Sequence, residues 1–177
     1  MLNAATLTDI ASNLRNLAAD VQRTSLDAPW QLSIPFSAIR DGDLGQLQPI
    51  KDRSTRGARY IYAFRVAEDD CAALHAAFVA ARQAGTGGRA YCRVNTASPL
   101  LYVGSSANLH SRMKDHLGFG YKSTYAMHLS HWLPAREGHI NLQVWQFAET
   151  TPSPVIQAIE DGLWALGQPM FGRQGAR

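Results

Sequence analysis

The sequence predicts an α+β fold in which a small, mainly antiparallel sheet is flanked by helices. One observation is the order of its segments: strands, then helices, then a strand and a helix, without the regular alternation of a doubly wound sheet. A second is the composition of the 177 residues, of which 46% are hydrophobic and 18% are charged. These proportions fit a globular domain rather than a disordered chain.

Residues 1–55 are predicted to form an N-terminal extension, a helix followed by an irregular segment. The helix spans 6–22, because apolar residues recur there three and four positions apart: Leu7, Ile10, Leu14, Leu17 and Val21. This stripe is expected to pack on the protein's own core, and its heptad-like spacing leaves a homodimer contact as the alternative. Residues 28–58 contain prolines and the turn signal RDGDLG, so they are predicted to be irregular.

Residues 56–177 are predicted to form the main domain. β-rich segments predict strands at 59–66 (RYIYAFRV), 89–94 (RAYCRV), 100–104 (LLYVG) and 140–147 (INLQVWQF). Helices are expected at 70–84, 107–117, 124–133 and 153–166. In the first of these helices, Leu74 and Phe78 are the expected buried pair.

The composition also bears on location. No apolar stretch has the length of a membrane span, and the N-terminus lacks the basic region of a signal peptide. Two cysteines, Cys71 and Cys92, cannot build a disulfide framework, and neither has a second cysteine at zinc-ligand spacing. We expect no membrane contact and a reducing cytoplasm.

Positive charge is concentrated in one part of the chain, although the net charge is only +3. Residues 71–136 carry seven lysines and arginines against the single acid Asp115. A shorter basic run, Lys51, Arg53, Arg56 and Arg59, precedes them. Such density suits a phosphate backbone, and a solvated basic surface is the alternative.

Chemically capable side chains accompany the predicted strands and helices. Tyr62 and Tyr102 fall on strands expected to be neighbours, and Arg112 and His116 lie four residues apart on one helix face. Glu160 lies beside the apolar side of the last helix, where a carboxylate usually has a cationic or metal partner. His128 and His131 lack a third ligand at sensible spacing, so we expect no metal site there.

These residues and their order resemble the GIY-YIG nuclease family over about residues 57–175. The first motif appears as Tyr60-Ile61-Tyr62, with tyrosine where the family usually has glycine, and the second as Tyr102-Val103-Gly104. The following segment SSANLHSRMKDH matches the family pattern through Ser105, Asn108, Leu109, Arg112 and His116. A late helix with one glutamate before a proline, here Glu160 and Pro169, is a further family feature.

The chain departs from the family pattern in two places. Residues 67–98 insert a helix, and a predicted strand, between the two tyrosine motifs, which a short hairpin normally joins. The family often has an asparagine shortly after the proline, whereas Gly172 or Arg173 stands near that place here and Gln174 could substitute as a polar group.

The resemblance implies a role for each site residue. Glu160 would hold a single Mg²⁺ or Mn²⁺, and Arg112 would clamp the scissile phosphate. Tyr62 is favoured as general base, with His116 taking or sharing its proton, and Tyr102 would orient water or phosphate. Residues expected to contact nucleic acid are Ser105, Ser106 and Asn108 at the turn, and the basic side chains of Arg89, Arg93, Lys114 and Lys122.

The function expected from this resemblance is metal-dependent hydrolysis of DNA phosphodiester bonds by an endonuclease. A catalytically silent module that binds nucleic acid or protein on the same fold is one alternative. An RNA-cleaving variant is another. The insertion at 67–98 is expected to lie outside the catalytic face, because its alanine-rich helix lacks a basic stripe.

Overall fold

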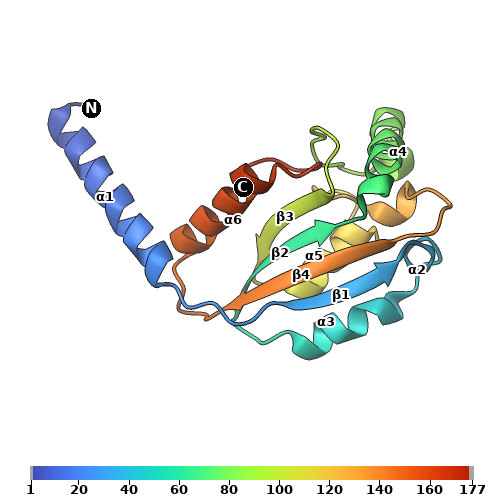
Figure 1. Ribbon diagram of the computed structural model, residues 1–177, viewed down its shortest axis with the longest axis horizontal. Coiled ribbons are helices and arrows are strands. Elements are labelled where there is room, and N and C mark those ends of the chain that lie inside the picture. Colours follow the sequence, from blue (N-terminus) through green and yellow to red (C-terminus); the bar gives the residue numbers. More distant parts are fainter. Residues whose placement is uncertain (1, 176–177) are drawn as a thin grey trace.

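The structure, a computed structural model that describes residues 2–175, is built on one four-stranded sheet in which all neighbouring strands are antiparallel. The strand order is β1-β4-β2-β3, so β2 and β4 are central (Figure 1). The strands are β1 (Trp30–Pro35), β2 (Arg59–Arg65), β3 (Leu100–Ser106) and β4 (His139–Phe147). The predicted α+β class with an antiparallel sheet is confirmed.

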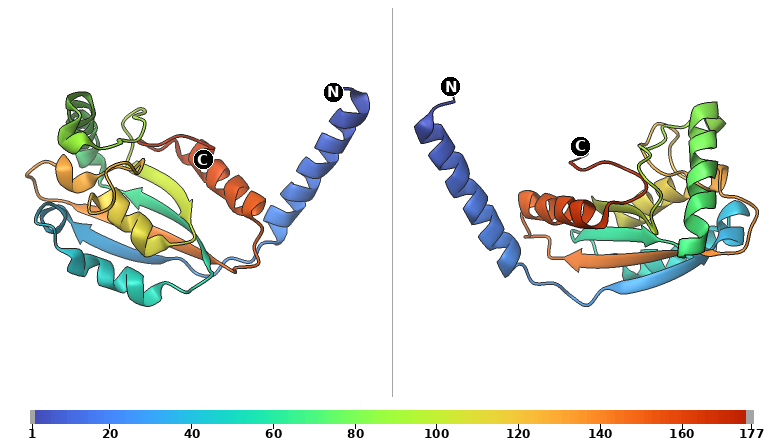
Figure 2. Two further views of the ribbon diagram at one scale, coloured as in Figure 1. Left: turned by 180° about the vertical axis from the view of Figure 1, so that it is seen from behind. Right: turned by 45° about the horizontal axis from the view of Figure 1, so that its top comes forward.

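Helices cover both faces of this sheet, as the two further views show (Figure 2). One face carries α6 (Ser153–Gly167), and the other carries the larger hydrophobic core together with α5 (Leu109–Leu117). Two short helices, α2 (Phe36–Arg40) and α3 (Gln48–Arg53), and the longer α4 (Cys71–Ala84) contribute to the same core.

Strand β2 shows how the sequence specifies the two layers. Tyr60, Tyr62 and Phe64 point into the larger core, and the alternate residues Ile61 and Ala63 pack on the α6 side. Successive side chains of a strand point to opposite faces, so a strand covered on both sides must be apolar at nearly every position. This explains the continuous apolar run of RYIYAFRV.

The prediction that residues 28–58 are irregular is wrong. Residues 30–53 form β1, α2 and α3, and β1 pairs along its length with β4. Ile34, Phe36 and Ile50 are fully buried in the same core as β2 and α5. The segment is therefore part of the main fold, and a boundary at residue 55 does not separate two cores.

Two further elements differ from expectation. Residues 89–94 make only isolated bridges, Tyr91 with Ala126 and Val94 with Phe171, instead of a strand. Residues 124–133 contain a single 3₁₀ turn at Leu129–His131 in place of a helix, and it starts after a residue in the left-handed region (φ 52°). Both segments pair their backbone groups with distant parts of the chain, which local sequence patterns do not report.

The inserted segment 67–98 packs against the domain through α4. Leu74 and Phe78 are fully buried, as predicted, and Phe78 contacts the rings of Trp132 and Phe171. Burial of two such side chains stabilises the fold by about 1.5–3 kcal/mol each. The insertion is thus a structural part of the core.

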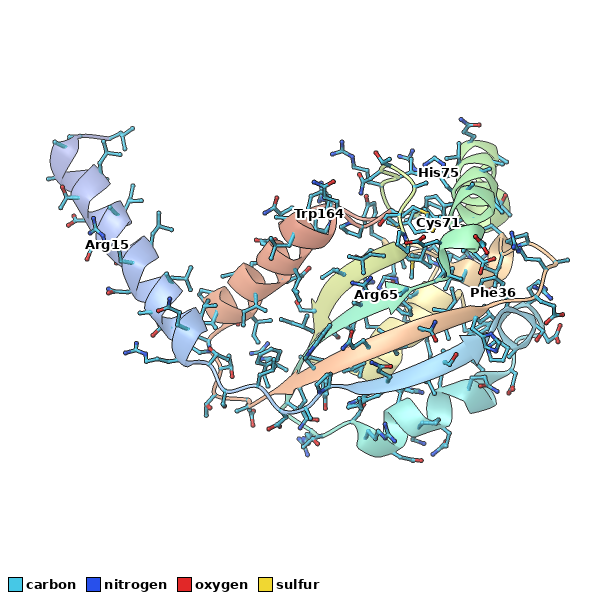
Figure 3. The ribbon with its side chains drawn as sticks, in the orientation of Figure 1. Arg15, Phe36, Arg65, Cys71, His75 and Trp164 are labelled. Carbon is cyan, nitrogen blue, oxygen red and sulfur yellow. The ribbon has the colours of Figure 1, made fainter. Side chains whose placement is uncertain are left out.

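The N-terminal helix α1 (Ala4–Arg23) projects from the body and contacts only α6 closely (Figure 1). The prediction that its apolar stripe packs on the core is wrong: no residue of α1 is buried, and Leu7, Ile10 and Leu14 are about half exposed. Figure 3 shows Arg15 extending from this helix, far from the sheet. Among residues 2–175, no helix has the length and apolar composition that a membrane crossing needs.

Candidate active site

Two tyrosines from adjacent strands lie side by side near the edge of the sheet. Tyr62 on β2 pairs with Gly104 on β3, and Tyr102 pairs with Phe64. Phe64 is two residues from Tyr62 on β2, so the two side chains project from the same face of the sheet. Tyr102, which is paired with Phe64, projects from that face too. The ring centroids are 6.3 Å apart and the ring planes are 8° from parallel. The predicted placement on neighbouring strands is confirmed.

Gly104 leaves the space that these rings occupy. A Cβ atom at this position would lie 2.6 Å from Tyr62 Oη and 2.9 Å from Tyr102 Cε1, much closer than the 3.5–4.0 Å optimum for non-bonded atoms. The glycine of the second motif is therefore required by the packing of the two tyrosines.

Helix α5 brings Arg112 to both hydroxyls. The helix begins after Asn108, whose side chain accepts a hydrogen bond from the Ser111 amide at 3.1 Å. One turn later, Arg112 Nε donates to Tyr62 Oη at 3.1 Å, and Nη2 donates to Tyr102 Oη at 3.3 Å. Nη2 also donates to the backbone carbonyl of Tyr125 at 3.0 Å. Three of the five guanidinium N–H groups are thus used within the protein.

His116 lies below this cluster and is fully buried. Its Nε2 is 3.0 Å from Tyr62 Oη, and the rings of Tyr62, Phe64 and Tyr102 surround it. Burial, with the nearby charge of Arg112, lowers the pKa of His116 well below its usual value. The imidazole is therefore neutral, and its Nε2 can accept a hydrogen bond from the Tyr62 hydroxyl while Arg112 donates to the same oxygen.

Glu160 approaches from the opposite face of the sheet, on α6. Ser105 Oγ donates to Glu160 Oε2 at 2.5 Å. Glu160 lines a cavity of about 240 Å³ together with Tyr62, Tyr102 and Arg112. The cavity thus lies at the β3 edge and receives side chains from both faces: the predicted residues Tyr62, Tyr102, Arg112 and Glu160 meet there, with His116 buried directly behind Tyr62.

The electrostatics of the cavity keep both phenols protonated at neutral pH. Burial raises the pKa of Tyr102 to about 12, and it raises the pKa of Tyr62 further. The positive charge of Arg112 opposes this rise at both residues, and the negative charge of Glu160 adds to it. Removing the proton of Tyr62 therefore depends on its contacts with Arg112 and His116.

The residues predicted to contact nucleic acid fall into two groups. Ser105 and Ser106 line the cavity, and Asn108 caps the adjacent helix. The four basic residues lie outside the cavity lining: Arg89, Arg93, Lys114 and Lys122. Of these, Arg89 is half-buried and its Nη1 donates to the Gly120 carbonyl at 3.3 Å, so its guanidinium already serves the protein's own structure.

Several residues of the site were not predicted from the sequence. Arg59, Ser153 and Gln157 also line the cavity. The backbone carbonyl of Tyr125 holds Arg112, although a carbonyl leaves no trace in a sequence pattern. Arg59 does carry a signal, because it belongs to the basic run just before the first tyrosine motif.

The C-terminal segment reaches the site from behind Tyr102. Gly172 has φ +94°, and a Cβ there would lie 2.9 Å from the Tyr102 ring, so a side chain in place of this glycine would be strained. The side chain of Asn95, in the insertion, donates to the carbonyls of Pro169 and Gly172 and fastens the segment. Gln174 donates to the Asp161 carbonyl and does not line the cavity.

The donor set of the cavity fits a weakly preorganised Mg²⁺ or Mn²⁺ site. Within residues 2–175 no three His, Cys, Asp or Glu side chains gather to form a metal cage. Glu160 is the one carboxylate among the described lining residues, and a serine hydroxyl lies next to it. Mg²⁺ is commonly held by one or two carboxylates with water and substrate phosphate as further ligands, so this set suits it.

Neither a protein-family model, nor a curated protein, nor a solved structure matches the chain. The residues of the cavity and their geometry are therefore what bears on its function.

Proposed function

We propose that the protein is a metal-dependent endonuclease that hydrolyses DNA phosphodiester bonds, as its resemblance to the GIY-YIG nucleases implies. One observation carries the proposal. Arg112 donates to the hydroxyls of Tyr62 and Tyr102 in a cavity that Glu160 lines from the other face of the sheet. A cation, two phenols and a carboxylate around one cavity are groups that phosphoryl chemistry uses.

Arg112 is suited to hold the scissile phosphate. Its Nη1 atom makes no hydrogen bond within residues 2–175, and its nearest carboxylate, on Asp115, is 3.9 Å away. Two N–H groups of a planar, permanently charged side chain can therefore meet phosphate oxygens. Because the other N–H groups are held by Tyr62, Tyr102 and Tyr125, the guanidinium is positioned before the substrate arrives.

Tyr62 and His116 form the proton-accepting pair of the proposed reaction. The Tyr62 hydroxyl would donate to the neutral imidazole of His116 at Nε2 while its oxygen accepts from Arg112 Nε, so Tyr62 shares its proton with His116 and does not lose it beforehand. As general base, Tyr62 would take a proton from the attacking water in the same step in which its own proton moves toward His116 Nε2. Tyr102 shares the same arginine and would orient water or phosphate.

Glu160, with the neighbouring Ser105 hydroxyl, would hold the divalent ion. When bound, such an ion neutralises charge on the phosphate and on the leaving oxygen. Ile156 and Gln157, from the same helix, complete that side of the cavity.

The proposal is tested by Glu160→Gln, which keeps the shape of the side chain and removes its charge. We expect cleavage of supercoiled plasmid in Mg²⁺ to fall by at least about 10²-fold, the scale for losing one preorganised electrostatic contact. DNA affinity should hold or rise, because a negative charge leaves a phosphate-binding cavity. Glu137→Gln is the matched control, since Glu137 is exposed and lies outside the cavity, and it should cleave as the wild type does.

The same assay separates the alternatives. Unchanged cleavage by Glu160→Gln would contradict the proposed metal site. A wild-type protein that binds DNA but never cleaves it would be a silent binding module. Cleavage of RNA in place of plasmid or single-stranded DNA would identify the RNA-cleaving variant.

A further inference from the structure

An exposed aromatic and basic surface lies next to Arg112, outside the cavity. It consists of Tyr121, Lys122, Tyr125, Arg93 and Arg173, and we call it the Tyr125 patch. Tyr121, Lys122 and Tyr125 belong to one loop, in which the Thr124 amide donates to the Tyr121 carbonyl to close a turn. All five residues are exposed, and none lines the cavity.

Contacts around Tyr125 join the patch to the site. The Tyr125 carbonyl accepts from Arg112 Nη2 at 3.0 Å, so this end of the loop contacts the proposed phosphate clamp. The Tyr125 hydroxyl accepts from the Arg93 amide at 2.5 Å. The guanidinium of Arg173 lies over the Tyr125 ring, 5.9 Å from its centroid, within the range of a cation–π contact.

Tyr121 is the more exposed of the two tyrosines in the patch. It is 80% exposed, and its side chain makes no hydrogen bond or ring contact within residues 2–175. Tyr125 is 39% exposed. Two accessible phenol rings with three cationic side chains combine a stacking platform with charges that follow a phosphate backbone.

We propose that the Tyr125 patch binds an unpaired strand of the nucleic acid beside the scissile phosphate. Unpaired bases stack on Tyr121 and Tyr125, and Arg93, Lys122 and Arg173 contact the phosphates of that strand. The substrate class is then DNA with a single-stranded segment adjacent to the cleaved bond. This inference rests on the proposed function for the position of that bond, while the binding itself does not require cleavage.

The choice of an unpaired strand over a duplex follows from the side chains. In a duplex the base faces are stacked on one another, so they are not free to stack on the ring of an exposed tyrosine. The cationic residues alone would attract either form, because both forms carry negatively charged phosphates. The two tyrosines are therefore what distinguishes the two ligands.

The test measures binding in EDTA, so that cleavage does not interfere. The probes are a fluorescein-labelled DNA strand of about 20 nucleotides, longer than a single-strand site of roughly 4–16 nucleotides, and the same strand annealed to its complement. We expect the wild type to prefer the single strand. Tyr121→Ala should weaken single-strand binding by about fivefold or more, the effect of removing one stacking ring, and should change duplex binding less than about twofold.

Two variants serve as controls. Tyr121→Phe keeps the aromatic face and should bind within about twofold of the wild type. Leu166→Ala removes an apolar side chain that is 88% exposed on α6, and it should leave both affinities unchanged. Melting temperatures on the same preparations establish that each variant is folded.

Three results would overturn the inference: no binding of the single strand, equal loss of duplex and single-strand binding in Tyr121→Ala, or no effect of Tyr121→Ala. The last would leave the patch as a surface for another partner, such as an acidic protein. Single-strand binding without any cleavage would contradict the nuclease proposal and support single-strand binding by the Tyr125 patch. Duplex cleavage without a preference for the single strand would support the nuclease proposal and contradict the inference about the patch.

Discussion

Gly104 is the residue whose identity the site depends on most directly. Its missing side chain is what allows Tyr62 and Tyr102 to stack and to share Arg112. The contact is with a ring that is fully buried, so the neighbour has little room to move. A single methyl group here would displace the proposed base from its partners.

We predict that Gly104→Ala lowers the free energy of unfolding by about 1–3 kcal/mol, the usual cost of overpacking. It should also abolish cleavage, because the Tyr62 hydroxyl would leave Arg112 and His116. Gly162→Ala is the matched control, since a Cβ at Gly162 meets nothing within 4 Å. In that helical position alanine should be neutral or stabilising by up to about 1 kcal/mol. Equal effects of the two changes in thermal unfolding would contradict this account.

At the scale of elements, α1 and α4 contrast in what their apolar residues do. Leu74 and Phe78 of α4 are fully buried, whereas Leu14 of α1 is 60% exposed. The exposed stripe keeps its heptad-like spacing, so the homodimer contact through the N-terminal helix stays a prediction.

We expect Leu14→Asp to change the free energy of unfolding by about 0.5 kcal/mol or less, as for most surface substitutions. Leu74→Ala should cost about 2–5 kcal/mol, because it leaves a cavity in the core. Sedimentation of the wild type and of Leu14→Asp then tests the dimer. A dimer that Leu14→Asp converts to a monomer would support the contact, and a monomeric wild type would contradict it.

At the scale of the whole molecule, a neutral histidine in the main core links stability to pH. His116 is fully buried, and burial, Arg112 and His128 all lower its pKa from the usual value of 6.5. Below about pH 6.5, His116 therefore binds a proton in the unfolded chain but stays unprotonated in the folded protein. The stability that depends on the neutral imidazole is present above that pH and is lost as the pH falls toward the depressed folded pKa.

The free energy of unfolding should fall by up to about 1.4 kcal/mol per pH unit across that window. Denaturant unfolding between neutral and mildly acidic pH measures the slope. His116→Gln should be less stable at neutral pH but should show a shallower slope, whereas the exposed His139→Gln should keep the wild-type slope. An unchanged slope in His116→Gln would show that His116 is not the group responsible.

The sequence alone determined the elements whose patterns are local. β2, β3, β4, α5 and α6 lie where the sequence predicted strands and helices, because each pattern is read within a single segment. The grouping of Tyr62, Tyr102 and Arg112 was also predictable, since two neighbouring strands and the helix after them have few ways to place those side chains.

Only the tertiary structure decided the rest. β1 became a strand because β4, far along the chain, supplies its hydrogen-bond partners, and residues 89–94 stayed irregular because their backbone groups pair with a loop and the C-terminal segment. The carbonyl of Tyr125 acquired its place beside Arg112 in the same way. Backbone donors and acceptors are the same in every residue except proline, so their long-range pairing has no signature in the side chains and is settled only when the chain packs.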